Sequence, residues 1–273
     1  MIYELPTSEI RVVKRFFPGK HLDMVISSIA EGNTDARLWV DQPTTARTAL
    51  LWDKGNNVFY LGGQFCDLHF LENLSRFVRN EIMRCAIEEN CPDFTVHECG
   101  KIFQGRGLKV FRDYNLRPRR TLFLQHHQLE SVKKSKAIDN DLTIRPIDRS
   151  LLDACDLEHV PFVRREVEWM WPSIDRFYDN GFGFVAIAEG KVTSWCTAEY
   201  VSRQMCGVGI ETMPDYQDRG IATVVARAFV NNCLNKGIVA YWECDVENLA
   251  SVRVAEKVGF KMVEQSPSYA GRF

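Results

Sequence analysis

The sequence predicts an α+β fold built from two parts, residues 1–138 and 139–273. Three observations lead to this prediction. Short runs rich in β-branched and aromatic residues alternate with longer segments whose apolar residues recur every three or four positions, which are the patterns of strands and amphipathic helices. A length of 273 residues is enough for two domains. With 45% hydrophobic and 26% charged residues, the composition is that of a globular protein able to bury a core.

In the first part, turn-forming residues separate short strand-forming runs, so we expect a meander. A helix is predicted over 67–89, where apolar residues recur at helical spacing behind Asp67, a residue type that starts helices. A polar segment at 131–140 is typical of an interdomain linker. The strands are predicted at 37–40, 46–52, 58–61, 94–97 and 121–124.

In the second part, strands and helices follow one another closely. Asp148 is placed to cap a short helix that carries Leu151 and Leu152. A longer helical stretch spans 163–180 and is interrupted at Pro172, because proline lacks the amide that a helix interior needs. The remaining strands are predicted at 142–145, 184–188, 193–201, 207–213, 239–244 and from 260 onward, with helices at 220–235 and 249–258.

Charge and hydropathy exclude several functional classes. The chain has 34 Lys and Arg residues against 36 Asp and Glu residues, a net charge of −2, so we expect no nucleic-acid partner. Charged residues break the apolar runs, so we expect that the chain has no signal peptide and no membrane span. We therefore expect a cytoplasmic protein without a membrane partner. The sequence leaves the oligomeric state open.

The cysteines and histidines predict neither a disulfide framework nor a metal site. The nine cysteines are an odd number and contain no C-x-x-C pair. The adjacent His126 and His127 would point to opposite faces of a strand. We interpret the cysteines mainly as small core residues.

The most informative segment is the loop 214–222, between a predicted strand and a strongly apolar helix. Gly220 allows the backbone to approach a ligand closely, and Ala222 keeps the first helical turn free of bulk. The amides from Gln217 to Ala222, together with the helix dipole, would form a nest for anionic oxygens. Such a nest suits a pyrophosphate.

This loop resembles the signature Q/R-x-x-G-x-G/A of the GNAT superfamily of acyl-CoA-dependent N-acyltransferases. Gln217, Gly220 and Ala222 match it. A second match is Asn248-x-x-Ser251, on a helix that ends in Gly-Phe as in the family. The resemblance implies a mixed, mostly antiparallel sheet flanked by helices over 139–273, joined to a smaller α+β domain.

The resemblance is closer to a subgroup that includes zwittermicin-resistance-like acetyltransferases with an extra N-terminal domain. The segments that carry it are 171–173, 181–184, 190–196 and 209–212. A faint echo of the signature at 104–109 suggests that the first part is a degenerate second GNAT domain, although a turn with basic neighbours explains it as well.

The resemblance also implies roles for individual residues. The co-substrate would be acetyl-CoA, with the main chain at Ile210 to Thr212 pairing with its pantetheine and Asn248 and Ser251 flanking its acyl end. The residues that would hold the pyrophosphate are Gln217, Asp218, Arg219, Gly220, Ile221 and Ala222.

Acyl transfer needs a base for the amine and an acid for the leaving sulfur. Glu211 is the candidate base, although its side chain could instead face solvent or pair with Arg203. Many GNAT enzymes place a tyrosine acid seven residues after the asparagine, where this chain has Ala255. The acid is then Tyr216 or another donor, Tyr241 or Ser251, or the thiolate leaves to solvent.

An acidic and aromatic segment before the strand predicted at 184–188 would recognise the acceptor. Its candidate residues are Glu166, Glu168, Trp169, Trp171 and Tyr178. They suit a cationic amine through ion-pair and cation–π contacts, although tryptophans at this spacing are as often core residues. We therefore expect transfer of an acetyl group to a primary amine of a small molecule. The alternatives are amino-acid N-acylation from a larger acyl-CoA and a non-catalytic acyl-CoA sensor.

Overall fold

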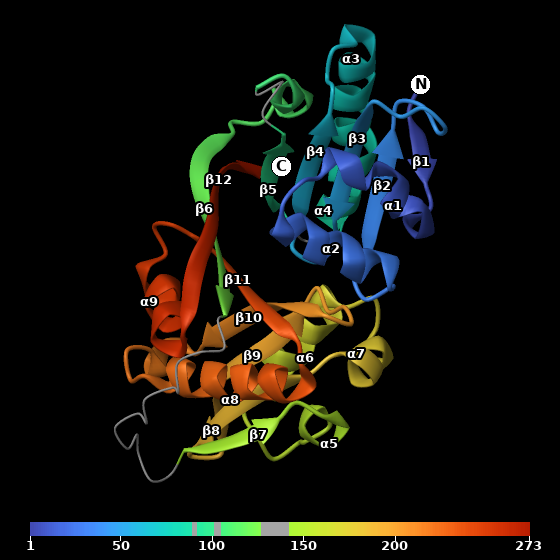
Figure 1. Cartoon of the computed structure of the whole chain (residues 1–273). Coiled ribbons are helices and arrows are strands. Elements are labelled where there is room, and N and C mark those ends of the chain that lie inside the picture. The colour runs from blue at the N-terminus through green and yellow to red at the C-terminus, as the bar shows by residue number, and fades with distance from the viewer. Residues whose placement is uncertain (89–91, 101–104, 127–141) are drawn as a thin grey trace. The chain divides into compact units, whose positions relative to one another are not determined.

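The computed structural model describes residues 1–88, 92–100, 105–126 and 142–273. The chain divides into two compact units (Figure 1). The first comprises Met1–Thr121 and Ser266–Phe273, and the second comprises Leu122–Gln265. The boundary expected between 138 and 139, and the expected linker at 131–140, lie outside the described residues. The last strand, β12 (Phe260–Arg272), begins in the second unit and ends in the first.

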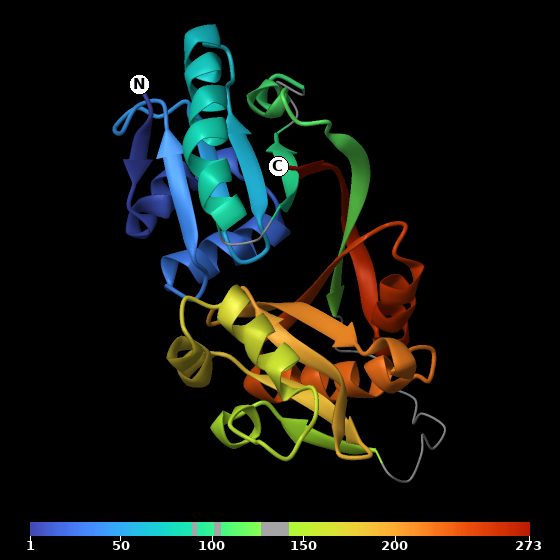
Figure 2. The ribbon, with the colours of Figure 1, turned by 180° about the vertical axis from the view of Figure 1, so that it is seen from behind.

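In the first unit, helices cover both faces of a sheet (Figure 2). His21 of α2 (Lys20–Ala30) lies 3.2 Å from the hydroxyl of Tyr60 on one face. Phe59 and Leu61, the neighbours of Tyr60, pack with Leu71 of α3 (Leu68–Phe77) on the other face, because side chains alternate along a strand. A π-helical turn at Val78–Ile82 joins α3 to α4 (Met83–Glu88).

The strand order in this unit is β1-β2-β3-β4-β5-β12. Neighbours are antiparallel except β4 and β5, which run parallel and stay paired from Val58↔Thr95 to Gly62↔Cys99. The remaining elements are β1 (Tyr3–Leu5), α1 (Ile10–Val13), β2 (Ala36–Val40), β3 (Thr48–Asp53), β4 (Val58–Gly63) and β5 (Asp93–Cys99). Strand β6 (Arg117–His126) begins in this unit and continues into the second.

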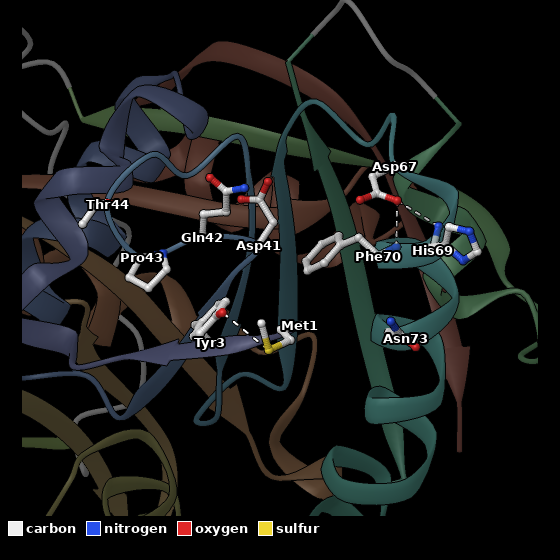
Figure 3. Close-up of a pocket in the computed structure, with 10 residues that line it drawn as sticks. All are labelled: Met1, Tyr3, Asp41, Gln42, Pro43, Thr44, Asp67, His69, Phe70 and Asn73. Atoms are coloured by element: carbon white, nitrogen blue, oxygen red, sulfur yellow. Dashed lines mark hydrogen bonds between the residues drawn. The ribbon is translucent and has the colours of Figure 1, made fainter.

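A cavity of about 430 Å³ lies in this unit, lined by residues that follow β2 and by the start of α3 (Figure 3). Its two carboxylates already serve the backbone. Asp41 accepts hydrogen bonds from the amides of Arg47 and Thr48, at the start of β3. Asp67 accepts from the amides of His69 and Phe70 and so caps α3. These acids therefore stabilise a turn and a helix end.

The second unit holds the sheet β12-β6-β11-β10-β9-β8-β7. All the neighbouring strands from β7 to β10 are antiparallel, and β10 and β11 are parallel. The elements are β7 (Thr143–Pro146), α5 (Arg149–Leu152), α6 (Val160–Met170), α7 (Ile174–Asn180), β8 (Gly183–Ala188), β9 (Lys191–Glu199), β10 (Met205–Thr212), α8 (Ile221–Lys236), β11 (Val239–Asp245) and α9 (Leu249–Val258).

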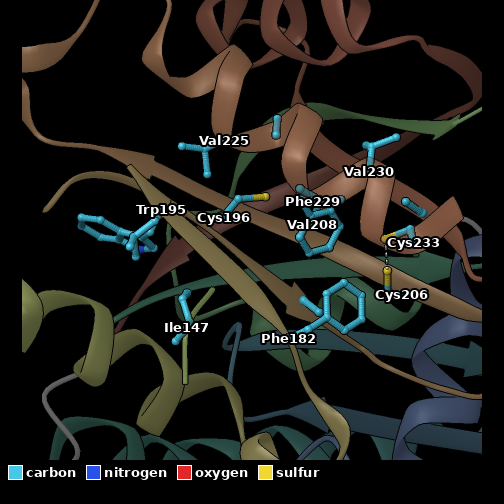
Figure 4. Close-up of a cluster of buried hydrophobic side chains, with 14 of the residues drawn as sticks. Ile147, Phe182, Trp195, Cys196, Cys206, Val208, Val225, Phe229, Val230 and Cys233 are labelled. Atoms are coloured by element: carbon cyan, nitrogen blue, oxygen red, sulfur yellow. Dashed lines mark hydrogen bonds between the residues drawn. The ribbon is translucent and has the colours of Figure 1, made fainter. Parts of the chain in front are cut away.

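Alternation along β9 separates the two faces of this sheet. Trp195 and Thr197 reach Glu166 of α6 on one face. Cys196 points to the opposite face, where Phe229 and Cys233 of α8 lie in the buried cluster (Figure 4). The sheet is thus packed between α6 and α8.

The buried cysteines of this core are inert small hydrophobes. Cys206 and Cys233 have sulfurs 3.7 Å apart (Figure 4), and burial raises the pKa of the Cys196 and Cys206 thiols. A protonated thiol is a poor nucleophile, so these residues contribute packing.

The α+β fold class expected from the sequence is confirmed. Most of the expected strands lie within two residues of their expected bounds, and the stretch 163–180 is broken around Pro172 into α6 and α7. Ser173 supplies the N-cap of α7, with its hydroxyl accepting from the amide of Arg176. The elements β1, α1 and α2 were not expected.

The signature-like segment 104–109 has a structural role where it is described. Residues 101–104 lie outside the described part of the chain. The amides of Gly105 and Gly107 donate to the carboxylate of Glu98, with the Gly107 bond at 2.7 Å. Because a carboxylate occupies these amides, they are not available to a phosphate.

The described residues contain neither a membrane-spanning helix nor a metal-binding cluster. Within 1–88, 92–100, 105–126 and 142–273, no helix is long and apolar enough to span a bilayer. Over the same residues, no group of three His, Cys, Asp or Glu side chains is arranged to hold a metal ion.

Candidate active site

Strands β10 and β11 pair over only a short stretch. Their parallel register runs from Met205↔Val239 to Gly207↔Tyr241. In contrast, β10 remains paired with β9 up to Thr212↔Ser194. Beyond Gly207, the edge of β10 that faces away from β9 therefore presents backbone groups without a strand partner, which is an opportunity for an extended ligand to pair with it.

The N-terminus of α8 follows this free edge in sequence. Gly220, its N-cap, has φ 81°, a left-handed conformation that glycine adopts without steric cost. Asp218 is also left-handed, with φ 59°. Through the described residues, the amides of Asp218, Arg219, Gly220, Ile221 and Ala222 donate to no protein acceptor. Amides without a partner at a helix N-terminus, together with the helix dipole, are suited to binding an anion.

The backbone amide of Gln217 was expected to be available to an anion, but it has a partner within the protein. Its amide donates to the Pro214 carbonyl at 3.3 Å, so the available amides begin at Asp218. Its side-chain Nε2 donates to the Thr212 carbonyl at 3.2 Å. Gln217 thus ties the loop back to the end of β10.

A cavity of about 600 Å³ lies against β10 on the face that α6 covers. This size is typical of small-molecule sites. Its lining comes from α6, β9, β10 and the two residues that follow Thr212: Phe162, Arg165, Glu166, Trp169, Met170, Trp195, Glu199, Gly209, Ile210, Glu211, Met213 and Pro214.

Glu166 is the carboxylate held most firmly in this cavity. Its Oε2 accepts from Trp195 Nε1 at 2.6 Å, and its Oε1 accepts from Thr197 Oγ1 at 2.8 Å. Burial raises the pKa of Glu166 above the ordinary value, the two hydrogen bonds oppose that shift, and the charge of Glu211 adds to it.

Glu211 lies on β10 at the same cavity, and its side chain is exposed rather than paired. The ion pair with Arg203 that the sequence allowed is absent from the part of the chain that the structure describes. The backbone carbonyl of Glu211 accepts a hydrogen bond from Ser194 Oγ at 2.7 Å, which fixes the backbone at this position.

The structure separates the five residues expected to bind the acceptor. Glu166 lines the cavity, whereas Tyr178 does not and has the Arg149 guanidinium 4.4 Å from its ring centroid. Trp169 lines the cavity and is 44% exposed. Glu168 does not line it and instead contacts Arg164 at 3.5 Å on the outer surface of α6. Trp171 is a core residue, 3% exposed, whose Nε1 donates to the Ala198 carbonyl.

The expected residues on α9 and in the loop are tied to local structure. Asn248 caps α9, with its Oδ1 accepting from the amide of Ser251. Ser251 Oγ accepts from Trp242 Nε1 at 2.9 Å. Ala255 is completely buried. Tyr216 is half-buried and does not line the cavity; the Arg219 guanidinium lies 5.1 Å from its ring centroid.

Several lining residues were not expected from the sequence, among them Phe162, Glu199 and Gly209. One signal was available for the first, because Phe162, Glu166 and Trp169 recur at steps of four and three and so share a face of α6. Gly209 and Glu199 gave no such signal, since their proximity depends on the pairing of β9 with β10.

Comparison with known proteins decides the family. Residues 14–269 match the family model described as GNAT acetyltransferase. The chain belongs to the GNAT acetyltransferase family. It is therefore an acetyltransferase enzyme, and the family generally uses acetyl-CoA as its co-substrate and acts on small-molecule or peptide acceptors. Because the match begins at residue 14, most of the first unit of this GNAT acetyltransferase lies within the family model.

Individual relatives agree with the family. The chain is 23% identical over 269 residues to an uncharacterized N-acetyltransferase, YdfB, of Bacillus subtilis, covering 98% of each chain. A GCN5-related N-acetyltransferase-like protein of Streptococcus suis has the same fold, with TM-score 0.70, 18% identity and coverage of 98% of this chain and 100% of that one. A GCN5-related N-acetyltransferase of Sphaerobacter thermophilus gives TM-score 0.61 at 12% identity, covering 100% and 95%.

Proposed function

We propose that this GNAT acetyltransferase transfers the acetyl group of acetyl-CoA to a primary amine of a small molecule. One observation carries the proposal. The edge of β10 loses its partner after Gly207 beside a helix whose N-terminal amides have no acceptor. An extended chain that ends in a pyrophosphate is complementary to this combination, because it can pair along the strand and place its charge on the helix.

The residues present fit acetyl-CoA. The amides of Asp218 to Ala222 would bind its pyrophosphate, with Arg219 as an exposed cation in the same loop. The main chain from Ile210 to Thr212 would pair with the pantetheine. Asn248 and Ser251, at the start of α9, would lie near the acyl end. When bound, acetyl-CoA supplies an acyl group activated as a thioester.

Glu211 would act as the base in this reaction. An ammonium ion has no lone pair, so the acceptor amine must lose a proton before it forms the new N–C bond. Glu211 lines the cavity on β10 and can take that proton directly or through a water. The thioester C–S bond breaks, and the sulfur leaves as the thiol once a proton reaches it.

Tyr216 is the proposed source of that last proton. The position of the family's usual tyrosine, Ala255, is buried in the core and carries no donor. Tyr216 lies in the loop that supplies the anion-binding amides, and the nearby Arg219 guanidinium packs over its ring. Solvent is the alternative donor, because a thiol with a pKa near 8.5 is a tolerable leaving group at neutral pH.

The first unit is proposed to be a degenerate GNAT-like unit without a cofactor site, in line with the zwittermicin-resistance-like subgroup. It repeats the order of three antiparallel strands, a helix and a parallel strand. However, the Asp67 carboxylate occupies the N-terminus of α3. Strands β4 and β5 also stay paired over five residues, from Val58 to Gly62 on β4. The second unit has an unpaired strand edge and free amides at a helix N-terminus. In the first unit the corresponding edge is paired and the corresponding amides are occupied.

The test is thiol release by the purified full chain from acetyl-CoA, compared with benzoyl-CoA and longer acyl-CoAs, in the presence of a panel of amines. The proposal predicts turnover that depends on the amine and is fastest with acetyl-CoA. Faster turnover with a larger acyl-CoA would favour amino-acid N-acylation. Tight acetyl-CoA binding without thiol release on any amine would make the protein a sensor, the possibility raised by Ala255.

A further inference from the structure

The cavity beside β10 also restricts the acceptor, if the proposed acetyl transfer is correct. Its walls combine an apolar part with an acidic part. Trp169, Met170 and Ile210 contribute apolar surface, and Trp169 is 44% exposed. The acidic part comes from two neighbouring elements, α6 and β10, which carry Glu166 and Glu211.

Carboxylates outnumber cations around this cavity. Glu166, Glu199 and Glu211 line it, and Arg165 is the one lining cation among the described residues. Arg165 is exposed, and its guanidinium lies 6.0 Å from the ring centroid of Phe162 at the rim. If all three carboxylates are ionised, the lining carries two negative charges more than positive ones.

The backbone of β10 leaves room for this acidic wall. Gly209 lies opposite Thr197 on β9. A Cβ at Gly209 would overlap Glu199 Oε1 and would lie 2.7 Å from Thr197 Oγ1, closer than Cβ atoms approach other heavy atoms. Thr197 in turn donates to Glu166. A glycine here therefore allows Glu199 and the Thr197–Glu166 pair to lie close to the strand.

One amine alone does not balance these charges. When Glu211 takes the proton of the reacting amine, both groups become neutral, so the reacting amine offsets the charge of Glu211 and none of the charge of Glu166. Glu166 is largely withdrawn from water, and its hydrogen bonds come from the neutral groups of Trp195 and Thr197. A buried carboxylate is most stable when a cation pairs with it.

We propose that the acceptor is a diamine, a molecule in which an apolar spacer separates the reacting amine from a second ammonium that stays charged. The second ammonium binds Glu166, the spacer lies on Trp169, Met170 and Ile210, and the reacting amine lies at Glu211. Only the amine at Glu211 gains the acetyl group and loses a proton, and the second ammonium is unchanged by the reaction. An amino-acid acceptor is disfavoured, because its carboxylate would face Glu166 and Glu211.

The test compares acceptors that differ at one end only. Thiol release from acetyl-CoA is measured for diaminoalkanes of four to eight carbons, for the alkylamines of the same lengths and for the matching ω-amino acids. We expect kcat/KM for the best diamine to exceed that of its alkylamine by at least about tenfold, the effect of one charged hydrogen bond. The ω-amino acid is expected to be the poorest of each set.

Two variants test whether Glu166 causes the preference for a diamine over an alkylamine. Glu166→Gln keeps the size of the side chain but removes the charge, and we expect it to abolish the preference of diamine over alkylamine. Asp175→Asn is the matched control, because Asp175 is 77% exposed on α7 and does not line the cavity; its preference should equal that of the wild type. Thermal unfolding verifies that both variants are folded.

The two proposals fail in different ways. Equal kcat/KM for diamine and alkylamine in the wild type, or a preference that survives in Glu166→Gln, would overturn the diamine proposal and leave acetyl transfer to amines intact. No thiol release with any of the compounds would overturn both.

Discussion

The Glu166 carboxylate on α6 accepts a hydrogen bond of 2.6 Å from the indole Nε1 of Trp195 on β9. This bond connects a helix to the middle of the sheet beside the candidate active site. Burial raises the pKa of Glu166 even though Trp195 and Thr197 both stabilise the charged form. Ionisation of Glu166 therefore costs the folded state free energy, which these two hydrogen bonds offset only in part.

The first prediction concerns the stability of Glu166→Gln. A carboxyl group with a raised pKa in the folded state stabilises the fold fully below its ordinary pKa, and this contribution is lost as the pH rises through the raised value. We expect the wild type to lose stability relative to Glu166→Gln over that range. Urea unfolding of both proteins at a series of pH values measures the difference, and a difference independent of pH would contradict the prediction.

The second prediction concerns two buried histidines of the first unit. Burial lowers the pKa of His97 to about 4, and burial together with the charge of His97 lowers the pKa of His21 to about 3. The two neutral histidines contribute to the free energy of unfolding above the unfolded-state pKa near 6.5. This contribution is lost as the pH falls toward their pKa values in the folded state. For His97 this loss amounts to roughly 3 kcal/mol, since each pKa unit corresponds to about 1.4 kcal/mol.

His97→Phe removes one titrating group and keeps a ring against Tyr60, with which His97 stacks at 5.4 Å. We expect the free energy of unfolding to fall less between pH 6.5 and 4 in this variant than in the wild type. His69→Asn, a change at an exposed histidine, is the control and should retain the wild-type slope. A steep wild-type slope that persists in His97→Phe would refute the assignment.

The third prediction concerns Glu211. Glu211→Gln keeps the shape of the side chain but cannot accept a proton. We expect kcat to fall about 10²- to 10⁴-fold, the usual contribution of a general base, while the Kd of acetyl-CoA changes little. Steady-state kinetics and calorimetry separate the two quantities. A variant with full activity across the pH range would remove Glu211 from the mechanism, and Asp175→Asn controls for loss of a surface charge.

The fourth prediction concerns truncation. In the second unit, β6 lies between β11 and β12, and its Leu122 and Leu124 are buried. Deleting residues 1–138 removes that strand, and burial of each leucine stabilises by about 2 kcal/mol. We therefore expect a chain of residues 139–273 not to unfold cooperatively. A chain of residues 117–265 keeps β6 and should do so, and cooperative unfolding of 139–273 would contradict this expectation.

Local patterns predicted most of the elements, because they depend on residues near in sequence. The break around Pro172 and the left-handed Gly220 are examples, as proline and glycine act on their own backbone. Local patterns did not predict that β12 begins in the second unit and ends in the first. That path depends on pairing between residues far apart in sequence, such as Tyr269↔Val96.

The same limit applies to the candidate site. The loop before α8 follows from its own residues, so the sequence predicted its position and its free amides, apart from that of Gln217. Helical spacing alone did not rank Glu166 above Glu168, which lies two residues away and faces the outer surface. Only the contacts of Trp195 and Thr197 with Glu166 distinguish the two.

Calorimetric titration of acetyl-CoA into the full chain measures binding at the proposed pyrophosphate site. Gly220→Asp places a carboxylate at the proposed pyrophosphate site, and Gly237→Asp introduces the same residue at another left-handed glycine, at the far end of α8 with φ 68°. We expect one saturable site per chain, lost in Gly220→Asp and retained in Gly237→Asp. Absence of binding to the wild type, or equal affinity in Gly220→Asp, would contradict it.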